Sequence, residues 1–440
     1  MTSAPDQAGM AFGGIPLDFV LFALTLLGVA LFHRHTLRVA LTGLAVIAAY
    51  KLLFGDFGGV PGALGLGNLL AREWVTLANL LGLLTGFALL ADHFERSGVP
   101  ALLPRYLPDD WRGGLCLLLL VFVISSFLDN IAAAMIGGTM AGGLYRNRVH
   151  IGFLAGIVAA SNAGGSGSVL GDTTTTMMWI AGVRPGQVFE AYVAAGVAML
   201  VFGVFAARQQ HRFQPIVKDN PAHARFHGSR LAIVALILLA AIASNLSFNL
   251  TAPAVLERLP VIGLAVWVAI LATALWRRPA WDLLPGALRG SVFLLSLVLC
   301  AAMMPVRHLP QASWQTTLGL GFVSAAFDNI PLTALALRQG GYDWSFVAYA
   351  VGFGGSMLWF GSSAGVALAT MYPQARSVGA WVKAGWHIAL AYVIGFLALL
   401  AVSGWHPDAP APRPRPAHGA TIPLDLNLNQ IRAGLRPQLP

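Results

Sequence analysis

Long runs of hydrophobic residues alternate with short polar or glycine-rich segments along this chain. An α-helix needs about 20 apolar residues to cross the hydrocarbon core of a bilayer. Several runs approach that length, and little chain separates one run from the next. The pattern therefore predicts an all-α polytopic membrane protein. The runs lie at 17–32, 38–54, 74–91, 113–127, 131–143, 151–161, 173–183, 187–207, 231–250, 260–276, 290–304, 314–327, 330–338, 345–354, 363–372 and 380–403.

Two sets of runs, within 113–183 and 314–372, are too short to cross a bilayer. Both sets are rich in Gly, Ser, Thr and Asn. Non-helical backbone at membrane depth is tolerated only where it is buried in protein or lines a wet cavity. We therefore expect each set to form a re-entrant hairpin followed by a broken helix.

The two sets are also related in sequence. The tripeptide Asp-Asn-Ile at 129–131 recurs at 328–330, and Gly-Gly-Ser at 164–166 recurs at 354–356. With the second alignment held, Gly-Asp-Thr at 171–173 falls on Gly-Ser-Ser at 361–363. A match in this order predicts an internal repeat.

Each half reads as three spans, a re-entrant hairpin, a broken helix and a final span. Because a re-entrant hairpin returns to its own side, each half crosses the bilayer an odd number of times. The second half should therefore be inverted relative to the first. Two inverted repeats with interrupted helices at their interface are typical of secondary transporters.

Charge fixes the expected orientation. Most of the 27 Lys and Arg residues fall in alternate loops, and such loops are cytoplasmic by the positive-inside rule. This places the N-terminus and the C-terminal tail outside, in a bacterial inner (plasma) membrane. The expected organisation is an N-terminal segment kept in the mature chain (1–16), a first transmembrane repeat (17–207), a basic cytoplasmic connector (208–230), a second, inverted repeat (231–403) and a Pro-rich disordered tail (404–440).

Composition supports the membrane interpretation. Hydrophobic residues make up 57% of the chain and charged residues 10%, whereas soluble domains carry about 25% charged residues. This excludes a cytosolic enzyme, a nucleic-acid binder and a disulfide-stapled secreted domain. The two cysteines, Cys116 and Cys300, lie in apolar runs and have no metal or redox spacing. We expect the lipid bilayer as a partner, and neither nucleic acid nor a cofactor.

Three acidic residues, Asp129, Asp172 and Asp328, fall deep in membrane segments, with no Lys or Arg at matching depth. A charge at the bilayer centre costs roughly 2.5–3.5 kcal/mol on the insertion scale. Desolvation and mutual repulsion favour carboxyl groups that are protonated or that hold a cation. These aspartates are therefore the candidate metal ligands, for transported Na⁺ or Li⁺ in competition with H⁺.

Neighbouring polar groups extend the candidate site, because hard cations prefer oxygen ligands. The stronger candidates flank the three aspartates and are Asn130, Thr173, Thr174, Asn329, Ser362 and Ser363. The weaker candidates are Asn162, Ser166, Ser356 and His387.

Structural interpretations compete with these assignments. Asp-Asn can form a simple turn in a hairpin, and Asp172 before a threonine run can cap a helix. Small polar residues also hold membrane helices together. His387, on the last span, could relay protons. A histidine that only packs in the core or at the interface is the favoured interpretation.

At these residues the chain resembles the NhaD-type sodium/proton antiporters of the ion transporter superfamily, whose relatives include arsenite permeases and citrate or dicarboxylate transporters. The resemblance covers about 17–403 and rests on the blocks FDNIPLT (327–333) and GDTTTTMMW (171–179). It implies an inverted-repeat fold with elevator-like or rocking motion, a homodimer, and proton-driven export of Na⁺ or Li⁺. Asp129, Asp172, Thr173 and Asp328 are the positions that it marks.

The chain also departs from the pattern. The first hairpin has Ala132 where the second has Pro331, and the second break has Ser362-Ser363 where the first has Asp172-Thr173. These departures leave open a sodium- or proton-coupled permease for a small anion, such as citrate, a dicarboxylate or arsenite. The acidic site without a midplane Lys or Arg favours the cation.

An enzyme is not expected. An intramembrane aspartic protease would require Gly-x-Gly-Asp, but the chain reads Val-Leu-Gly-Asp at 169–172. The repeated hairpin aspartates also have no use in that chemistry.

Overall fold

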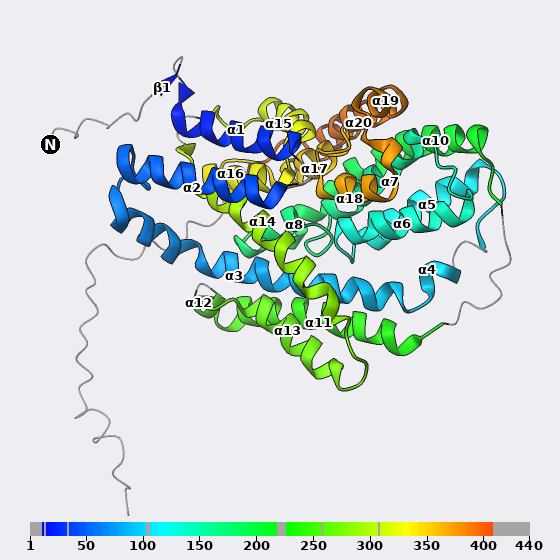
Figure 1. The fold of residues 1–440 in the computed structure, drawn as a ribbon, viewed down its shortest axis with the longest axis horizontal. Coiled ribbons are helices and arrows are strands. Elements are labelled where there is room, and N and C mark those ends of the chain that lie inside the picture. The colour runs from blue at the N-terminus through cyan, green and yellow to red at the C-terminus, as the bar shows by residue number, and fades with distance from the viewer. Residues whose placement is uncertain are drawn as a thin grey trace, which may run out of the picture. The chain divides into compact units, whose positions relative to one another are not determined.

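The computed structural model describes residues 11–12, 15–32, 35–102, 106–217, 226–256, 258–306 and 309–407. Apart from a two-residue strand pair, β1 (Ala11–Phe12) and β2 (Ile15–Pro16), its regular elements are helices (Figure 1). The predicted all-α polytopic class is confirmed by helices long and apolar enough to cross a membrane. These are Thr36–Phe54, Gly62–Glu95, Pro185–Phe213, Gly228–Phe248, Trp281–Ala302 and Trp386–Ser403.

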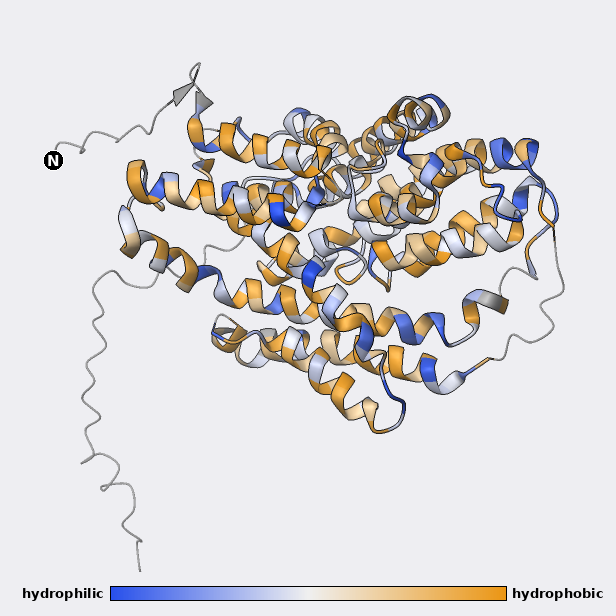
Figure 2. Cartoon of the chain, in the orientation of Figure 1, coloured by the Kyte–Doolittle hydropathy of each residue, from blue (hydrophilic) through white to orange (hydrophobic). Residues whose placement is uncertain are grey.

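The first three expected spans of each half form one set of packed helices, here called the outer helices. α1 packs on α2, both α2 and α3 pack on α14, and α3 also packs on α11 and α13. Hydrophobic residues predominate along these helices (Figure 2). The outer helices are α1 (Leu17–Leu31), α2 (Thr36–Phe54), α3 (Gly62–Glu95), α11 (Gly228–Thr251), α13 (Val261–Ala274) and α14 (Leu284–Ala302).

The expected hairpins, broken helices and final spans form a second set, here called the core helices. Two of them, α7 and α17, are buried along almost their whole length. The set comprises α5 (Trp111–Ser125), α6 (Asn130–Leu144), α7 (Ile151–Ser166), α8 (Thr173–Ile180), α10 (Ala191–Phe213), α15 (Trp314–Ala326), α16 (Asn329–Gln339), α17 (Trp344–Gly354), α18 (Ser363–Met371) and α20 (Trp386–Ser403). Short connecting helices are α4 (Val99–Leu102), α9 (Pro185–Phe189), α12 (Pro253–Leu256) and α19 (Val378–Ala384), with 3₁₀ turns at Trp281–Leu283 and Pro373–Arg376.

The helix interruptions occur where the sequence predicts them, and an acid or hydroxyl residue caps each restart. Asp129 caps α6 by accepting from the backbone N–H of Ile131 at 3.1 Å. Asp328 caps α16 in the same way, accepting from Ile330 at 3.0 Å. A capping oxygen satisfies a helix N–H that otherwise lacks a partner.

Contacts between helices repeat in the two halves. The Ser125 hydroxyl donates to the carbonyl of Ser161 at 2.6 Å, which joins α5 to α7. The Ser324 hydroxyl donates to the carbonyl of Val351 at 2.7 Å, which joins α15 to α17. All four positions correspond under the sequence repeat, so the repeat is also one of packing. The inverted orientation of the halves stays a prediction.

Glycines at matching positions bring these same helices together. A Cβ at Gly164 would overlap the carbonyl oxygen of Phe122, and a Cβ at Gly354 would overlap that of Gly321. Only glycine permits so close an approach of two backbones.

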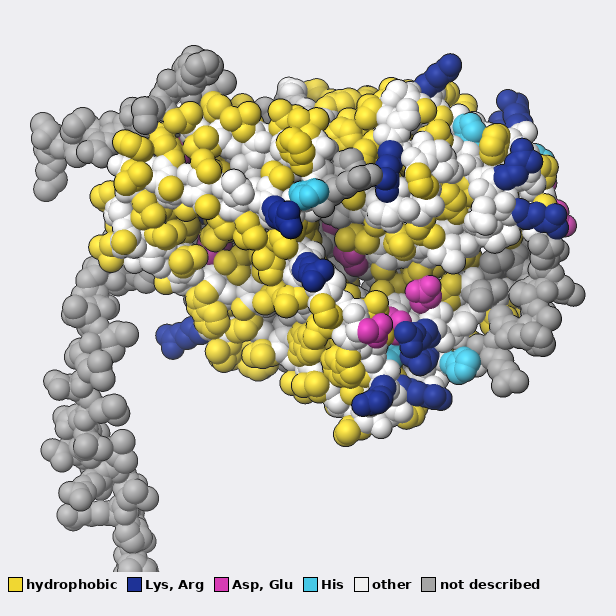
Figure 3. Space-filling view, in the orientation of Figure 1, with side chains coloured by type: hydrophobic (Ala, Val, Ile, Leu, Met, Phe, Trp, Pro, Cys, Tyr) yellow, Lys and Arg dark blue, Asp and Glu magenta, His cyan; other side chains and the backbone are white. Residues whose placement is uncertain are grey.

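The remaining domain predictions stay predictions. Residues 1–10, 218–225 and 408–440 lie outside the described residues, so the structure describes only parts of the expected N-terminal segment, connector and tail. Basic side chains gather toward one end of the face drawn in Figure 3, where α10 ends. The predicted connector, 208–230, begins at this end, and its cytoplasmic location stays a prediction.

Candidate ion-binding site

Asp172 links the first broken helix to the second hairpin. Its side chain caps α8 by accepting from the backbone N–H of Thr174 at 3.2 Å. Its other carboxyl oxygen lies 3.5 Å from the side-chain amide nitrogen of Asn329, which donates to it. Asp172 is 2% exposed and lies within electrostatic range of Asp129 and Asp328. The three predicted aspartates therefore belong to one region of the molecule.

Each of the two hairpin aspartates lies beside a hydroxyl residue. The Thr173 side chain lies beside the Asp129 carboxyl and interacts with it. The Ser363 hydroxyl donates to the Asp328 carboxyl at 3.1 Å. Thr173 and Ser363 correspond under the repeat, so each hairpin acid is held by the first residue of the opposing half-helix.

Asn162 joins parts of both halves. Its amide nitrogen donates to the Ser356 hydroxyl at 2.9 Å and to the Ser362 hydroxyl at 3.1 Å. Its amide oxygen accepts from Asn130 at 3.0 Å. Asn162 is fully buried. These bonds tie the first hairpin and first broken helix to the second break.

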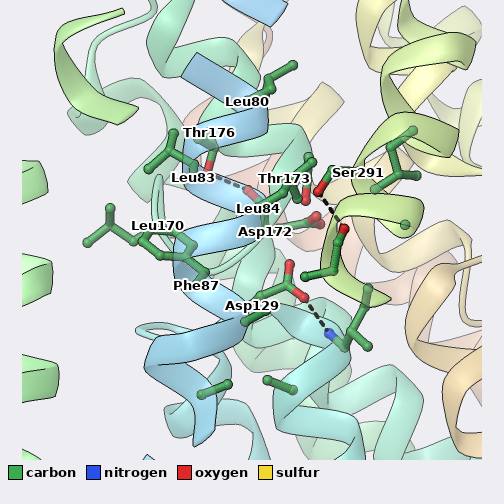
Figure 4. Close-up of a pocket in the computed structure, with 17 residues that line it drawn as sticks. Leu80, Leu83, Leu84, Phe87, Asp129, Leu170, Asp172, Thr173, Thr176 and Ser291 are labelled. Atoms are coloured by element: carbon green, nitrogen blue, oxygen red, sulfur yellow. Dashed lines mark hydrogen bonds between the residues drawn. The ribbon is translucent and has the colours of Figure 1, made fainter. Parts of the chain in front are cut away.

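A cavity of about 230 Å³ opens beside Asp129 and Asp172 (Figure 4). Thr173 and Thr176 of α8 complete its polar side. The opposite wall comes from the outer helices. On α3 this wall is apolar and consists of Leu80, Leu83, Leu84, Phe87, Ala88 and Ala91, and on α14 it includes Ser291.

The polar side chains of the cavity present hydrogen-bond acceptors. The Ser291 hydroxyl donates to the carbonyl of Ala287 at 2.8 Å, and the Thr176 hydroxyl donates to backbone carbonyls. The Thr173 hydroxyl interacts with the Asp129 carboxyl. Each hydroxyl has one proton, so its lone pairs remain for the cavity. Among the lining residues no Lys, Arg, His, Asn or Gln side chain offers a donor.

No protein-family model matches the chain. A sodium/proton antiporter of Arabidopsis thaliana is 27% identical over 391 residues, which cover 76% of this chain and 62% of that protein. The Na⁺/H⁺ antiporter NhaD of Vibrio parahaemolyticus is 29% identical over 301 residues, 57% of this chain and 71% of that protein. NhaD of Alkalimonas amylolytica is 27% identical over 300 residues, 57% of this chain and 59% of that protein.

The chain is similar to the NhaD-type sodium/proton antiporters. It spans less than two thirds of the length of the Arabidopsis relative. The resemblance seen in the blocks at 171–179 and 327–333 is thus confirmed at the level of the family.

Two of the three neighbouring aspartates line the cavity. Asp129 and Asp172 line the cavity, whereas Asp328 does not. Among the described residues, no three His, Cys, Asp or Glu side chains lie close enough to hold one metal ion. Binding of a transported cation by these acids stays a prediction, and two of them, not three, share the cavity.

The weaker candidates occupy different surroundings. The Ser166 hydroxyl donates to the carbonyl of Ala163 at 2.8 Å, within its own helix. Thr174, one of the stronger candidates, is also fully buried and does not line the cavity. His387 is fully buried on α20, stacked on Phe205 with ring centroids 6.1 Å apart, and is not a cavity residue. This position matches the packing interpretation of His387.

Sequence reasoning missed Ser291, Thr176 and the α3 wall. Thr176 belongs to the threonine run that contains the predicted Thr173 and Thr174. The signal for Ser291 was one hydroxyl next to a glycine at the start of an apolar run. Such a serine is common in membrane helices, where it often only bonds back to its own helix.

Proposed function

We propose that this chain exchanges Na⁺ or Li⁺ for H⁺ across the bacterial inner membrane, with Asp129 and Asp172 as the exchanging groups. The observation that carries the proposal is the set of acceptors in the cavity, two carboxyls and three hydroxyl oxygens, with no cationic side chain among the lining residues. Such a lining attracts a hard cation and repels an anion. The names of the relatives, sodium/proton antiporter and NhaD, agree with this chemistry.

Exchange follows from competition for the same oxygens. Without a bound ion, the two buried carboxyls repel each other and lack water, so protons bind them. A cation entering the cavity replaces protons on these groups, and the protons leave to the same solution. The reverse step on the other side completes the cycle. Transport is coupled because a charged, empty site is costly at membrane depth.

The location of the cavity indicates which side of the membrane it faces in the proposed cycle. It reaches Ala91 near the end of α3 and Ala287 near the start of α14. The adjoining segments carry Arg96, Arg277 and Arg278, and basic loops are cytoplasmic. We therefore assign this structure to an inward-facing state. The positions of both termini, the inverted repeat and the homodimer belong to the same proposal.

The anion permease is less well supported by the same geometry. An anion would need the helix N-termini at the site, where backbone N–H groups and the helix dipole attract negative charge. The first turns of α6 and α8 are instead capped by Asp129 and Asp172, which accept from those N–H groups.

The test uses purified protein in liposomes that hold a pH gradient. Na⁺, Li⁺ and K⁺ are added in turn, and dissipation of the gradient is followed with a pH-sensitive dye. We expect dissipation by Na⁺ or Li⁺ and its loss in Asp172→Asn. The matched control is Asp343→Asn, because Asp343 also caps a core helix, accepts from the N–H of Ser345 and is 8% exposed, but lies outside the cavity.

Two results would contradict the proposal. Exchange by Asp172→Asn at the rate of the unaltered protein would remove Asp172 from the site. A protein that responds to no cation but dissipates the gradient with citrate, succinate or arsenite would instead be an anion permease.

A further inference from the structure

Ser291 is the polar side chain that the outer helices contribute to the cavity. The other lining residues from α3 and α14 are Leu, Ala, Phe or Gly. Ser291 is 2% exposed, and the figure shows its hydroxyl end turned toward the part of the cavity that Asp172 and Thr173 face (Figure 4). A buried hydroxyl in an otherwise apolar wall, opposite two carboxyls, is placed where a cation would pass or bind.

Hydrogen bonding fixes the character of this oxygen. The Ser291 hydroxyl donates its proton to the carbonyl of Ala287 at 2.8 Å. Its lone pairs are then the groups available to the cavity, and they accept hydrogen bonds from water or contact a cation. A cavity of about 230 Å³ is far larger than a bare ion and has room for several water molecules at about 30 Å³ each.

Ser291 lies on an outer helix, whereas the two cavity aspartates lie on the core helices. Asp129 and Asp172 belong to the core helices, whereas α14 packs on the outer helices α2 and α3 and meets the core through α16. A ligand from α14 reaches the ion only while the acids face this wall. Any movement of the core along the outer helices breaks that contact.

We propose that Ser291 is a positioning residue that holds the partly hydrated cation against Asp129 and Asp172 in this state. Its oxygen accepts a hydrogen bond from a water of the bound ion. This inference rests on the proposed cation exchange and adds a contact from the opposite wall to the water shell of the ion.

The test compares Ser291→Ala with Ser296→Ala on the same helix. Ser296 is 4% exposed and donates to the carbonyl of Val292 at 2.7 Å, the same local bond, but it does not line the cavity. We expect Ser291→Ala to raise the KM for Na⁺ about three- to tenfold, the effect of one lost hydrogen bond. Ser296→Ala should keep the original KM. Ser291→Thr should also keep it, because threonine retains the hydroxyl.

A second measurement does not depend on transport. Na⁺ should raise the melting temperature of the purified protein, and Ser291→Ala should shift the midpoint of that Na⁺ titration by the same factor as the KM. An unchanged KM and midpoint in Ser291→Ala overturn the inference, as does an equal change in Ser296→Ala. Absence of Na⁺ exchange in the unaltered protein would instead refute the proposed function, so the two failures are distinguishable.

Discussion

Replacing Asn162 by alanine tests whether the contacts between the two halves hold the site together. The change removes three buried hydrogen bonds, to Ser356, Ser362 and Asn130, of 2.9, 3.1 and 3.0 Å. Hydrogen bonds between membrane helices average about 0.6 kcal/mol, which gives about 2 kcal/mol for three. The vacated volume, roughly 30 Å³, adds about 0.7 kcal/mol. We expect a total loss of about 2.5 kcal/mol.

The assay is thermal unfolding in detergent, with Ser161→Ala as the matched control. Ser161 is the neighbouring residue and is equally buried, but its hydroxyl bonds only to Val158 of its own helix, at 2.9 Å. Asn162→Ala should lower the apparent Tm by about 3–6 °C, and Ser161→Ala should change it by about 1 °C or less. Equal melting of the two variants would refute the reasoning about Asn162.

Transport kinetics show whether Asn162 holds the two halves together or binds the ion. Asn162 does not line the cavity, so Asn162→Ala should lower the maximal exchange rate and leave the KM for Na⁺ nearly unchanged. The reverse pattern, a higher KM with an unchanged maximal rate, would make Asn162 a ligand of the ion.

Three further predictions concern protons, packing and the hairpin acid. The KM for Na⁺ should rise as the pH falls, by at most about tenfold per pH unit for each proton displaced, because protons and Na⁺ compete; a KM independent of pH between 6 and 9 would contradict competition. Gly164→Ala and Gly354→Ala should each cost about 3 kcal/mol or more by forcing two backbones apart, whereas Gly196→Ala, where a Cβ meets nothing within 4 Å, should be neutral or stabilising in the same melting assay. Thr173→Val removes a hydroxyl that interacts with Asp129 and should raise the KM for Na⁺ several-fold in the liposome assay. An unchanged KM would contradict this prediction.

The helix interruptions could be predicted from the sequence because acidic residues stand out in apolar runs. Asp129 and Asp328 are charged residues in apolar runs, and the repeat pairs them. A carboxyl at that depth requires a cap, a cation or a proton, so its presence alone indicates a hairpin tip or a site. The predicted half-helices and the cap at Asp172 were therefore recoverable from residue types and order.

The walls of the cavity were not recoverable in this way. Apolar residues occur all around α3, so no periodic pattern marks which side faces the acids. The helix begins at Gly62, earlier than the predicted run at 74–91. The predicted run began at 74 because the charged residues Arg72 and Glu73 precede it. Glu73 forms an ion pair with Arg338 of α16 at 3.8 Å, a contact that depends on tertiary packing.

The two halves repeat their contacts but not their charges, and this difference bears on where an ion can bind. Asp172 corresponds to Ser362, and Asn162 corresponds to Gly352. A Cβ at Gly352 would lie 3.4 Å from the Asp172 carboxyl, so the acid faces bare backbone there. At the matching place in the other half, the Asn162 amide donates a hydrogen bond to the Ser362 hydroxyl oxygen. The amide N–H thus occupies a lone pair of this oxygen that could otherwise contact a cation. Under the proposed exchange, the second break is neutral and already satisfied by Asn162, so the charge that a cation must balance is concentrated in the first.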